Sequence, residues 1–272
     1  GEPSEAQLAQ TENLRLLQLT WAGADKYTRM ENLPQSVVLA NASGAFGTII
    51  AEYAIGSLVA LYRSFGRYWS NKQAHIWQKY DHAETISGKT ALVLGMGDIG
   101  ANMARRLKVF GAAVLGVKRT AVSAVPADFD EAHTLDALDA LLPRADIVIG
   151  CLPNTRETAG LLTAERLHAM KAGAVLVNVG RGSLAGTDDL VSALQDGHLG
   201  GAALDVFETE PLPVDCPLWD MENVLLTPHI AGPSFGGSAD VQNTIWHICM
   251  DNLERYLTGN PLKNVVNRSE GY

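Results

Sequence analysis

Residues 90–111 have the sequence TALVLGMGDIGANMARRLKVFG and decide the fold of this 272-residue chain. The run TALVL (90–94) lacks polar alternation, which is typical of a strand buried on both faces of a parallel sheet. The stretch ANMARRLKVFG (101–111) has the pattern of an amphipathic helix. Between them, Gly95 to Gly100 match the pattern GxGxxG. Strand, glycine loop and helix in this order predict a doubly wound α/β fold.

Each glycine of this loop has a separate physical role in such a fold. Gly95 permits the tight turn, Gly97 lets the backbone approach a pyrophosphate, and Gly100 lets the helix pack closely on the strand. The N-terminal amides and dipole of the helix then face the phosphates. A chain with 26 glycines contains this pattern by chance about 0.2 times. The flanking strand and helix therefore favour dinucleotide binding over an ordinary strand-to-helix turn.

Short apolar runs alternate with amphipathic stretches along the rest of the chain, which is typical of α/β domains. The predicted strands are residues 14–19, 36–40, 90–94, 112–117, 146–151, 174–178, 201–204 and 223–227. The predicted helices are residues 48–68, 99–109, 134–142, 163–170, 187–196 and 238–257. We expect a dinucleotide-binding domain over 66–239 and a smaller substrate domain built from 1–65 and 240–272.

The composition excludes several classes of protein. A formal net charge of −9 disfavours binding to nucleic acid or to an anionic membrane surface, because both require a basic face. We find no apolar run of about 18 residues and no basic-then-apolar leader, so we expect neither a membrane span nor a signal peptide. The cysteines Cys151, Cys216 and Cys249 are widely spaced, which predicts reduced thiols, a cytoplasmic location and no metal site.

The strand after the glycine loop ends at Lys118, Arg119 and Thr120. NAD sites usually place Asp or Glu near this point to bind the ribose 2′-hydroxyl, whereas NADP sites offer Arg to the 2′-phosphate. The chain has two cations here, Lys118 and Arg119, and the next carboxylate after them is Asp128. This pattern favours NADP(H) as the cofactor, with NAD(H) as the alternative. A further possibility is that the two cations are only solvated loop residues without a role in binding.

Three polar residues follow predicted strands at the edge where parallel sheets bind ligands. Arg181 follows AVLVN (174–178), Glu210 follows GAAL (201–204), and His229 follows NVLLT (223–227). Each residue alone has a simpler explanation as a surface arginine, a solvated glutamate or a half-buried histidine. Three such residues behind one nucleotide motif favour a catalytic site.

A series of longer motifs covers nearly the whole chain in a fixed order. They are TWAGAD (20–25), AEY (51–53), GMGDIG (95–100), CLPNT (151–155), NVGRG (178–182), DVFETEP (205–211), TPHIAG (227–232) and PLKNVV (261–266). With these motifs the chain resembles the D-isomer-specific 2-hydroxyacid dehydrogenases. The resemblance implies hydride transfer between NAD(P)H and a small 2-oxo acid, such as glyoxylate, hydroxypyruvate or a longer 2-oxo acid. Within the family, both the glyoxylate/hydroxypyruvate reductases and the short phosphoglycerate dehydrogenases stay open. It also implies a Rossmann domain with a second, flavodoxin-like α/β domain.

The resemblance implies catalytic roles for Arg181, Glu210 and His229. Arg181 would hold the substrate carboxylate and polarise the 2-oxo group by charge-assisted hydrogen bonds. His229 would be the general acid and base at the substrate oxygen. Glu210, the residue before the family proline, would orient the imidazole and favour its protonated form.

Further residues are assigned to the cofactor and to the substrate. The predicted cofactor residues are Gly95, Gly97, Asp98, Ile99, Gly100, Lys118, Arg119, Thr120, Cys151, Leu152, Pro153, Thr158, Val179, Gly180, Asp205, His229 and Gly232, with Asp205 near the nicotinamide carboxamide. The predicted substrate residues are Ala22, Gly23, Ala24, Arg181 and His229.

The chain departs from the family pattern at its start, because family members begin with a further strand-helix-strand-helix segment. We therefore expect the smaller domain to be incomplete at its N-terminal end, with an exposed sheet edge and apolar helix faces. The family dimerises through a helical arm that corresponds to about 48–75. An apolar stripe of this kind is more often plain core than interface, so the expected homodimer is what the resemblance implies.

Two other functions occur on folds of this kind. The same fold serves in some relatives as a nucleotide-sensing interaction protein with little turnover, which is the alternative to catalysis. Formate oxidation on this fold is disfavoured, because that branch pairs its histidine with glutamine, whereas this chain has Glu210.

Overall fold

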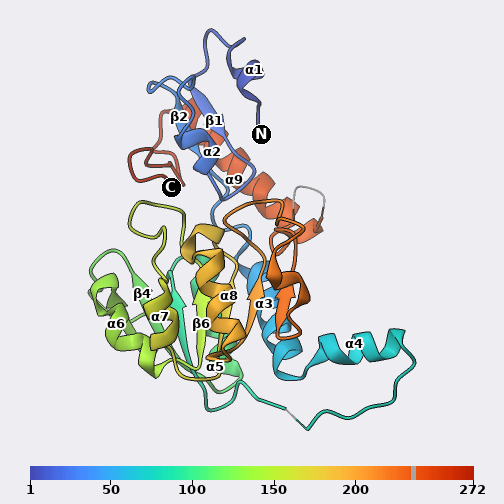
Figure 1. The fold of residues 1–272 in the computed structure, drawn as a ribbon. Helices are drawn as coiled ribbons and strands as arrows, with labels where there is room; N and C mark the ends of the chain where they lie inside the picture. Colours follow the sequence, from blue (N-terminus) through green and yellow to red (C-terminus); the bar gives the residue numbers. More distant parts are fainter. Residues whose placement is uncertain (82, 234–236) are drawn as a thin grey trace. The chain divides into compact units, whose positions relative to one another are not determined.

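The protein is described by a computed structural model covering residues 1–81, 83–233 and 237–272 (Figure 1). The chain divides into two compact units. The large unit comprises 47–152 and 156–231, and the small unit comprises 1–46, 153–155 and 232–272.

A parallel sheet forms the centre of the large unit. Among the described residues it has seven strands: β3 (Thr90–Leu94), β4 (Ala113–Lys118), β5 (Glu131–Thr134), β6 (Ile147–Gly150), β7 (Ala174–Asn178), β8 (Leu199–Leu204) and β9 (Val224–Leu226). Their order is β5-β4-β3-β6-β7-β8-β9. Within this sheet the chain first forms β3, then β4 and β5 on one side of it, and then crosses back to form β6 on the other side of β3. The strand order thus reverses between β3 and β6, where α/β sheets open a crevice for ligands.

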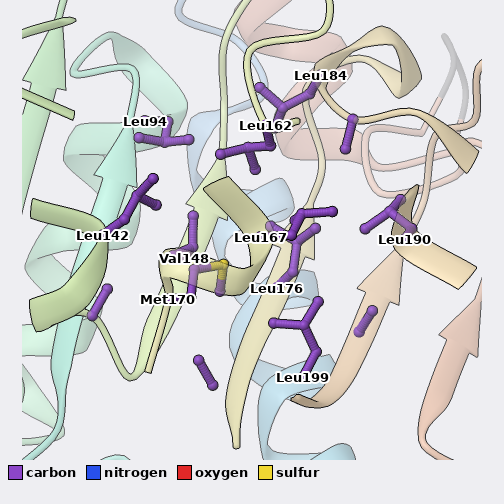
Figure 2. Close-up of a cluster of buried hydrophobic side chains, with 14 of the residues drawn as sticks. Leu94, Leu142, Val148, Leu162, Leu167, Met170, Leu176, Leu184, Leu190 and Leu199 are labelled. Atoms are coloured by element: carbon purple, nitrogen blue, oxygen red, sulfur yellow. The ribbon is translucent and has the colours of Figure 1, made fainter. Parts of the chain in front are cut away.

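Helices cover both faces of this sheet (Figure 1). On one face, α3 (Gly47–Tyr62) packs against α5 (Asp98–Val109) and against β7, β8 and β9. On the other, α6 (Leu138–Leu141), α7 (Ala164–Ala169) and α8 (Thr187–Gln195) share an apolar core with the strands. Figure 2 shows part of this core, which includes Leu94, Val148 and Leu176 from the strands, Leu167 of α7 and Leu190 of α8. The predicted doubly wound fold is confirmed.

The small unit contains α1 (Glu5–Leu8), β1 (Leu16–Gln18), α2 (Asp25–Thr28), β2 (Val38–Ala40) and α9 (Ala239–Thr258). The strands β1 and β2 pair in parallel, and Ala40 forms an antiparallel bridge with Val265. Its core is built around Leu19, Leu33 and Leu39. The helix α9 exposes apolar side chains, namely Trp246, Met250, Leu253 and Leu257.

The division between the units differs from the predicted boundaries, because α3 belongs to the large unit. The Gly47 amide donates to Asp98 Oδ2 at 2.8 Å, and Arg106 of α5 forms an ion pair with Glu52 at 2.9 Å. These bonds and the packing of α3 on the sheet move the first boundary from 65 to 46. The small unit also resumes at Gly232 rather than at 240.

Three secondary-structure predictions needed correction. The helix expected over 48–68 breaks at Ser64, whose φ of 52° is left-handed, and continues as α4 (Phe65–Gln73). The strand β5 was missed because its residues EAHT are half-buried at the sheet edge and form no apolar run. The helix expected over 134–142 consists of the short α6 between two 3-10 turns, Leu135–Ala137 and Leu142–Arg144.

Two further observations concern membranes and thiols. No helix in the described part of the chain is long and apolar enough to span a bilayer. Cys151, Cys216 and Cys249 are all free, as the sequence predicts.

Candidate active site

The ends of six neighbouring strands lie in register at one edge of the large sheet. The aligned residues are Val117, Leu94, Gly150, Asn178, Leu204 and Leu226, from β4 across to β9. The residues that follow them therefore emerge along the same edge. This row contains the glycine loop, the Lys118–Thr120 turn, Arg181, Asp205 and His229.

The glycine loop has the geometry of a phosphate cradle. Gly95 has a φ of +107°, a conformation that favours glycine. A Cβ on Gly100 would lie 1.7 Å from the carbonyl oxygen of Gly95, so only glycine allows this close packing. A Cβ on Gly97, in contrast, would meet nothing within 4 Å. The space in front of Gly97 and the first turn of α5 fits a pyrophosphate held by backbone amides.

This difference yields a matched pair of variants. We expect Gly100→Ala to lower the melting temperature of the ligand-free protein, because the new Cβ clashes with backbone. Gly97→Ala should leave that temperature unchanged and weaken cofactor binding about tenfold or more, since the methyl group occupies only the cradle. Thermal unfolding and fluorescence titration with NADPH measure the two effects. Equal destabilisation of the free protein by both variants would contradict the cradle.

Asp98 takes part in this region mainly as a structural residue. Its Oδ2 accepts from the Gly47 amide, and its Oδ1 accepts from Asn102 Nδ2 at 3.1 Å. Its carboxylate thus joins the start of α5 to the start of α3. Any contribution of Asp98 to a cofactor would come through its backbone in the first turn of α5.

Arg181 is held at the end of β7 by a buried asparagine. Asn178 Oδ1 accepts from the Gly180 amide at 3.2 Å, and Asn178 Nδ2 donates to the Arg181 carbonyl at 2.9 Å. The Arg181 guanidinium donates through Nη1 to the Gly180 carbonyl at 2.8 Å. Asn178 was not among the predicted site residues, although a polar residue at the end of the apolar strand AVLVN is a signal for one.

His229 forms a hydrogen-bonded pair with Glu210. The distance from His229 Nδ1 to Glu210 Oε2 is 2.9 Å. Glu210 Oε1 accepts from the Phe207 amide at 3.0 Å, which holds the carboxylate in place. The neighbouring Glu208 points elsewhere, since its Oε2 accepts from the Thr187 amide at the start of α8. The structure thus brings Glu210, rather than Glu208, to the histidine.

Asp205 holds the loop that carries His229. Its buried carboxylate accepts from Thr227 Oγ1 at 2.6 Å and from the Ile230 amide at 2.8 Å, both through Oδ1. Its Oδ2 accepts from the Ala231 amide at 2.9 Å. Asp205 was predicted near a nicotinamide, and the structure adds this structural role. Thr227 belongs to the same network and was missed as a site residue.

The other predicted site residues divide between the units. Cys151, Leu152, Thr158 and Val179 lie in the large unit, and burial raises the pKa of the Cys151 thiol to about 12. The remaining residues Ala22, Gly23, Ala24, Pro153 and Gly232 belong to the small unit. There the turn after β1 is held by Asn41 Nδ2, which donates to the Ala22 carbonyl at 2.7 Å.

The parallel sheet carries a glycine cradle at its switch point, with an arginine and a histidine–carboxylate pair along the same edge. This combination defines the class of nicotinamide-dependent oxidoreductases. Comparison with known families agrees: a family model for the D-isomer specific 2-hydroxyacid dehydrogenase NAD binding domain matches residues 55–231. The chain belongs to the D-isomer specific 2-hydroxyacid dehydrogenase family, which confirms the resemblance noted in the sequence.

Individual relatives show the same relationship. The chain is 31% identical to glyoxylate reductase from Thermofilum pendens over 264 residues, which is 94% of this chain and 76% of that protein. A D-isomer specific 2-hydroxyacid dehydrogenase from Xanthobacter autotrophicus Py2, solved with NADPH and MES, is 33% identical with a TM-score of 0.87. An NADPH-dependent glyoxylate/hydroxypyruvate reductase from Sinorhizobium meliloti, solved with NADP and sulfate, is 29% identical with a TM-score of 0.87. Both matches cover 100% of this chain and 84% of the solved chain.

Family, fold and site together assign the reaction class. The protein is an NAD(P)-dependent oxidoreductase that transfers a hydride between NAD(P)H and a 2-oxo acid or its 2-hydroxy acid.

Proposed function

We propose that the enzyme uses NADPH to reduce a small 2-oxo acid of the glyoxylate and hydroxypyruvate kind, with Arg181, His229 and Glu210 as its catalytic residues. The observation that carries the proposal is the 2.9 Å pair of His229 Nδ1 and Glu210 Oε2, which lies on the same sheet edge as Arg181 and the glycine cradle. The reductases from Thermofilum and Sinorhizobium support the choice of substrate.

Arg181 would bind the substrate through its charge. A guanidinium can form two parallel hydrogen bonds to a carboxylate and can also polarise the adjacent 2-oxo group. The Asn178 contacts hold the backbone of Arg181 in place, so part of the ordering is complete before the substrate arrives.

His229 would supply the proton that balances the hydride. The nicotinamide, when bound, supplies the hydride to C2 of the 2-oxo acid. With Nδ1 held by Glu210, His229 would donate its Nε2 proton to the 2-oxo oxygen, which becomes the hydroxyl of the product. The Glu210 carboxylate would accept the Nδ1 proton and so fix the orientation of the imidazole ring.

Turnover by the purified chain tests the proposed function directly. We expect oxidation of NADPH with glyoxylate or hydroxypyruvate to be faster than with 2-oxoisocaproate or phenylpyruvate. Cofactor binding would be measured in parallel by fluorescence. Binding of NADPH without turnover of any of these acids would contradict the proposal and favour a nucleotide-sensing protein.

The cofactor preference is proposed from the turn after β4. Lys118 is half-buried at the end of the strand, and Arg119 and Thr120 are exposed. We expect replacement of Lys118 by Asp and Arg119 by Pro to weaken NADPH binding about a hundredfold, because the cations that face the 2′-phosphate are lost. NADH binding should change little. Dissociation constants for both cofactors measure the effect, and an unchanged NADPH-to-NADH ratio would contradict the preference.

We also propose a homodimer formed through the arm that contains α4. Of the predicted stripe over 48–75, Leu58 and Tyr62 are buried within the large unit, whereas Phe65 and Trp69 are more than half exposed. Beyond α4, the Trp77 side chain is 98% exposed. Such a group of exposed aromatic side chains is typical of an interface. The free cysteines support the further proposal of a cytoplasmic location.

The dimer is tested by the mass of the particle in solution. We expect the wild-type chain to elute as a dimer in light-scattering chromatography, and Trp69→Glu with Trp77→Glu to elute as a monomer, because charge is buried at the interface. An exposed control, Val214→Glu, should stay dimeric, since Val214 is 97% exposed outside the arm. A monomeric wild-type protein would contradict the dimer.

A further inference from the structure

The backbone of His229 has an unusual conformation that the surrounding structure must hold. Its φ of 55° lies in the left-handed region, which is uncommon for residues other than glycine. Such conformations persist when neighbouring contacts over-determine them. Here the His229 amide donates to the Asp205 carbonyl at 2.8 Å, and the next two amides donate to the Asp205 carboxylate. The direction of the imidazole therefore depends on Asp205.

A second chain of hydrogen bonds reaches Asp205 from helix α3. Thr227 Oγ1 donates to Asp205 Oδ1 at 2.6 Å, and the Tyr53 hydroxyl lies 2.5 Å from Thr227 Oγ1. A carboxylate only accepts, and a threonine hydroxyl has one proton. Because the Thr227 proton goes to Asp205, Tyr53 must be the donor to Thr227. The bonds therefore run in one direction, from Tyr53 through Thr227 to Asp205.

Tyr53 is well suited to this role as a fixed donor. Its side chain is half-buried, and burial raises its pKa above the usual value for tyrosine, so the hydroxyl keeps its proton across the working range. The helix that carries it is tied to α5 by the Gly47–Asp98 bond and the Glu52–Arg106 ion pair. Since α5 begins at the glycine cradle, Tyr53 connects the cofactor helix to the loop of His229.

We propose that Tyr53 is a positioning residue for His229, acting through Thr227 and Asp205. The proposal rests on the proposed role of His229 as proton donor. In this arrangement the hydroxyl of Tyr53 does not touch the substrate. It holds Thr227 in the position that lets Asp205 fix the left-handed turn at His229, and so keeps the imidazole aligned with Glu210.

The test is the substitution Tyr53→Phe in the whole chain, with kcat and KM measured for reduction of glyoxylate by NADPH. We expect kcat to fall about tenfold, while the NADPH dissociation constant and the KM for glyoxylate change less than about twofold, because only the alignment of the proton donor is lost. Thr227→Val should lower kcat at least as much, and Thr227→Ser, which keeps the hydroxyl, should restore it. In the double variant Tyr53→Phe with Thr227→Val, kcat should be no lower than in Thr227→Val alone.

Tyr62→Phe is the matched control, because Tyr62 is a buried tyrosine on the same helix α3 at the opposite end from the His229 network. Thermal unfolding checks that all variants are folded. Three results would each overturn the inference. The first is a wild-type kcat in Tyr53→Phe, and the second is a fall in kcat in Tyr62→Phe as large as in Tyr53→Phe. The third is a kcat in the double variant that falls by the product of the two single effects. The same assay includes His229→Ala, which we expect to be inactive. An active His229→Ala variant would overturn the proposed function itself, separately from the role of Tyr53.

Discussion

His229→Ala is expected to lower kcat for 2-oxo acid reduction by about a thousandfold, within the range for loss of a general acid. Without the imidazole, the substrate oxygen gains negative charge with no adjacent proton donor. The cofactor cradle lies on other strands, so the NADPH dissociation constant should change less than about twofold. Steady-state kinetics and fluorescence titration of the same preparation measure both quantities.

The chain offers a matched control for this variant in His168. Its Nε2 lies 2.8 Å from Asp196 Oδ2, so it also forms a half-exposed histidine–carboxylate pair, and this hydrogen bond raises the pKa of His168. His168 lies on α7, whereas His229 follows β9 at the carboxyl edge of the sheet. His168→Ala should therefore retain near-wild-type kcat. Retained turnover in His229→Ala would refute the assignment of the proton donor.

Arg181→Ala is expected to lower kcat/KM by about a thousandfold, because it removes both the carboxylate contact and the charge that polarises the 2-oxo group. Arg181→Lys keeps the positive charge but loses the planar fork of donors, so we expect it to recover only about a tenth to a hundredth of wild-type kcat/KM. Substrate saturation curves for both variants separate the binding loss from the loss in kcat.

The control for this series is Arg166, which also holds a carboxylate through two nitrogens. Arg166 lies on α7, and its Nε and Nη2 donate to the two Asp139 oxygens at 2.7 and 3.2 Å. Arg166→Lys should leave kcat/KM unchanged. Full activity in Arg181→Lys would show that charge alone is enough at this position, which would contradict the proposed two-point contact.

Much of the large unit could be predicted because its signals are local. Strands β3 and β7 were predicted residue for residue, since a strand buried on both faces is a continuous apolar run. The glycine loop was found because three glycines at a fixed spacing stand between a buried strand and an amphipathic helix. The edge strand β5 and the break at Ser64 were missed, because a half-exposed strand and a single left-handed residue leave no periodic pattern.

The unit to which α3 belongs could not be predicted from local sequence. Its apolar stripe was visible, but nothing in the pattern tells which partner covers it. That choice depended on contacts between residues about fifty positions apart, such as Gly47 with Asp98 and Glu52 with Arg106. The same holds for Tyr53, whose bond to Thr227 joins residues that are 174 positions apart.

The sequence by itself determined the doubly wound fold, the glycine cradle and the identity of Arg181, Glu210 and His229 as candidates. These features follow from periodicity and from residue types at strand ends, which are properties of short segments. Only the tertiary structure decided that Glu208 accepts from the Thr187 amide, that Asp98 joins α3 to α5, and that Tyr53 reaches the His229 loop. The physical reason is that a hydrogen bond depends on distances of a few ångströms between side chains, and strand register across the sheet sets those distances.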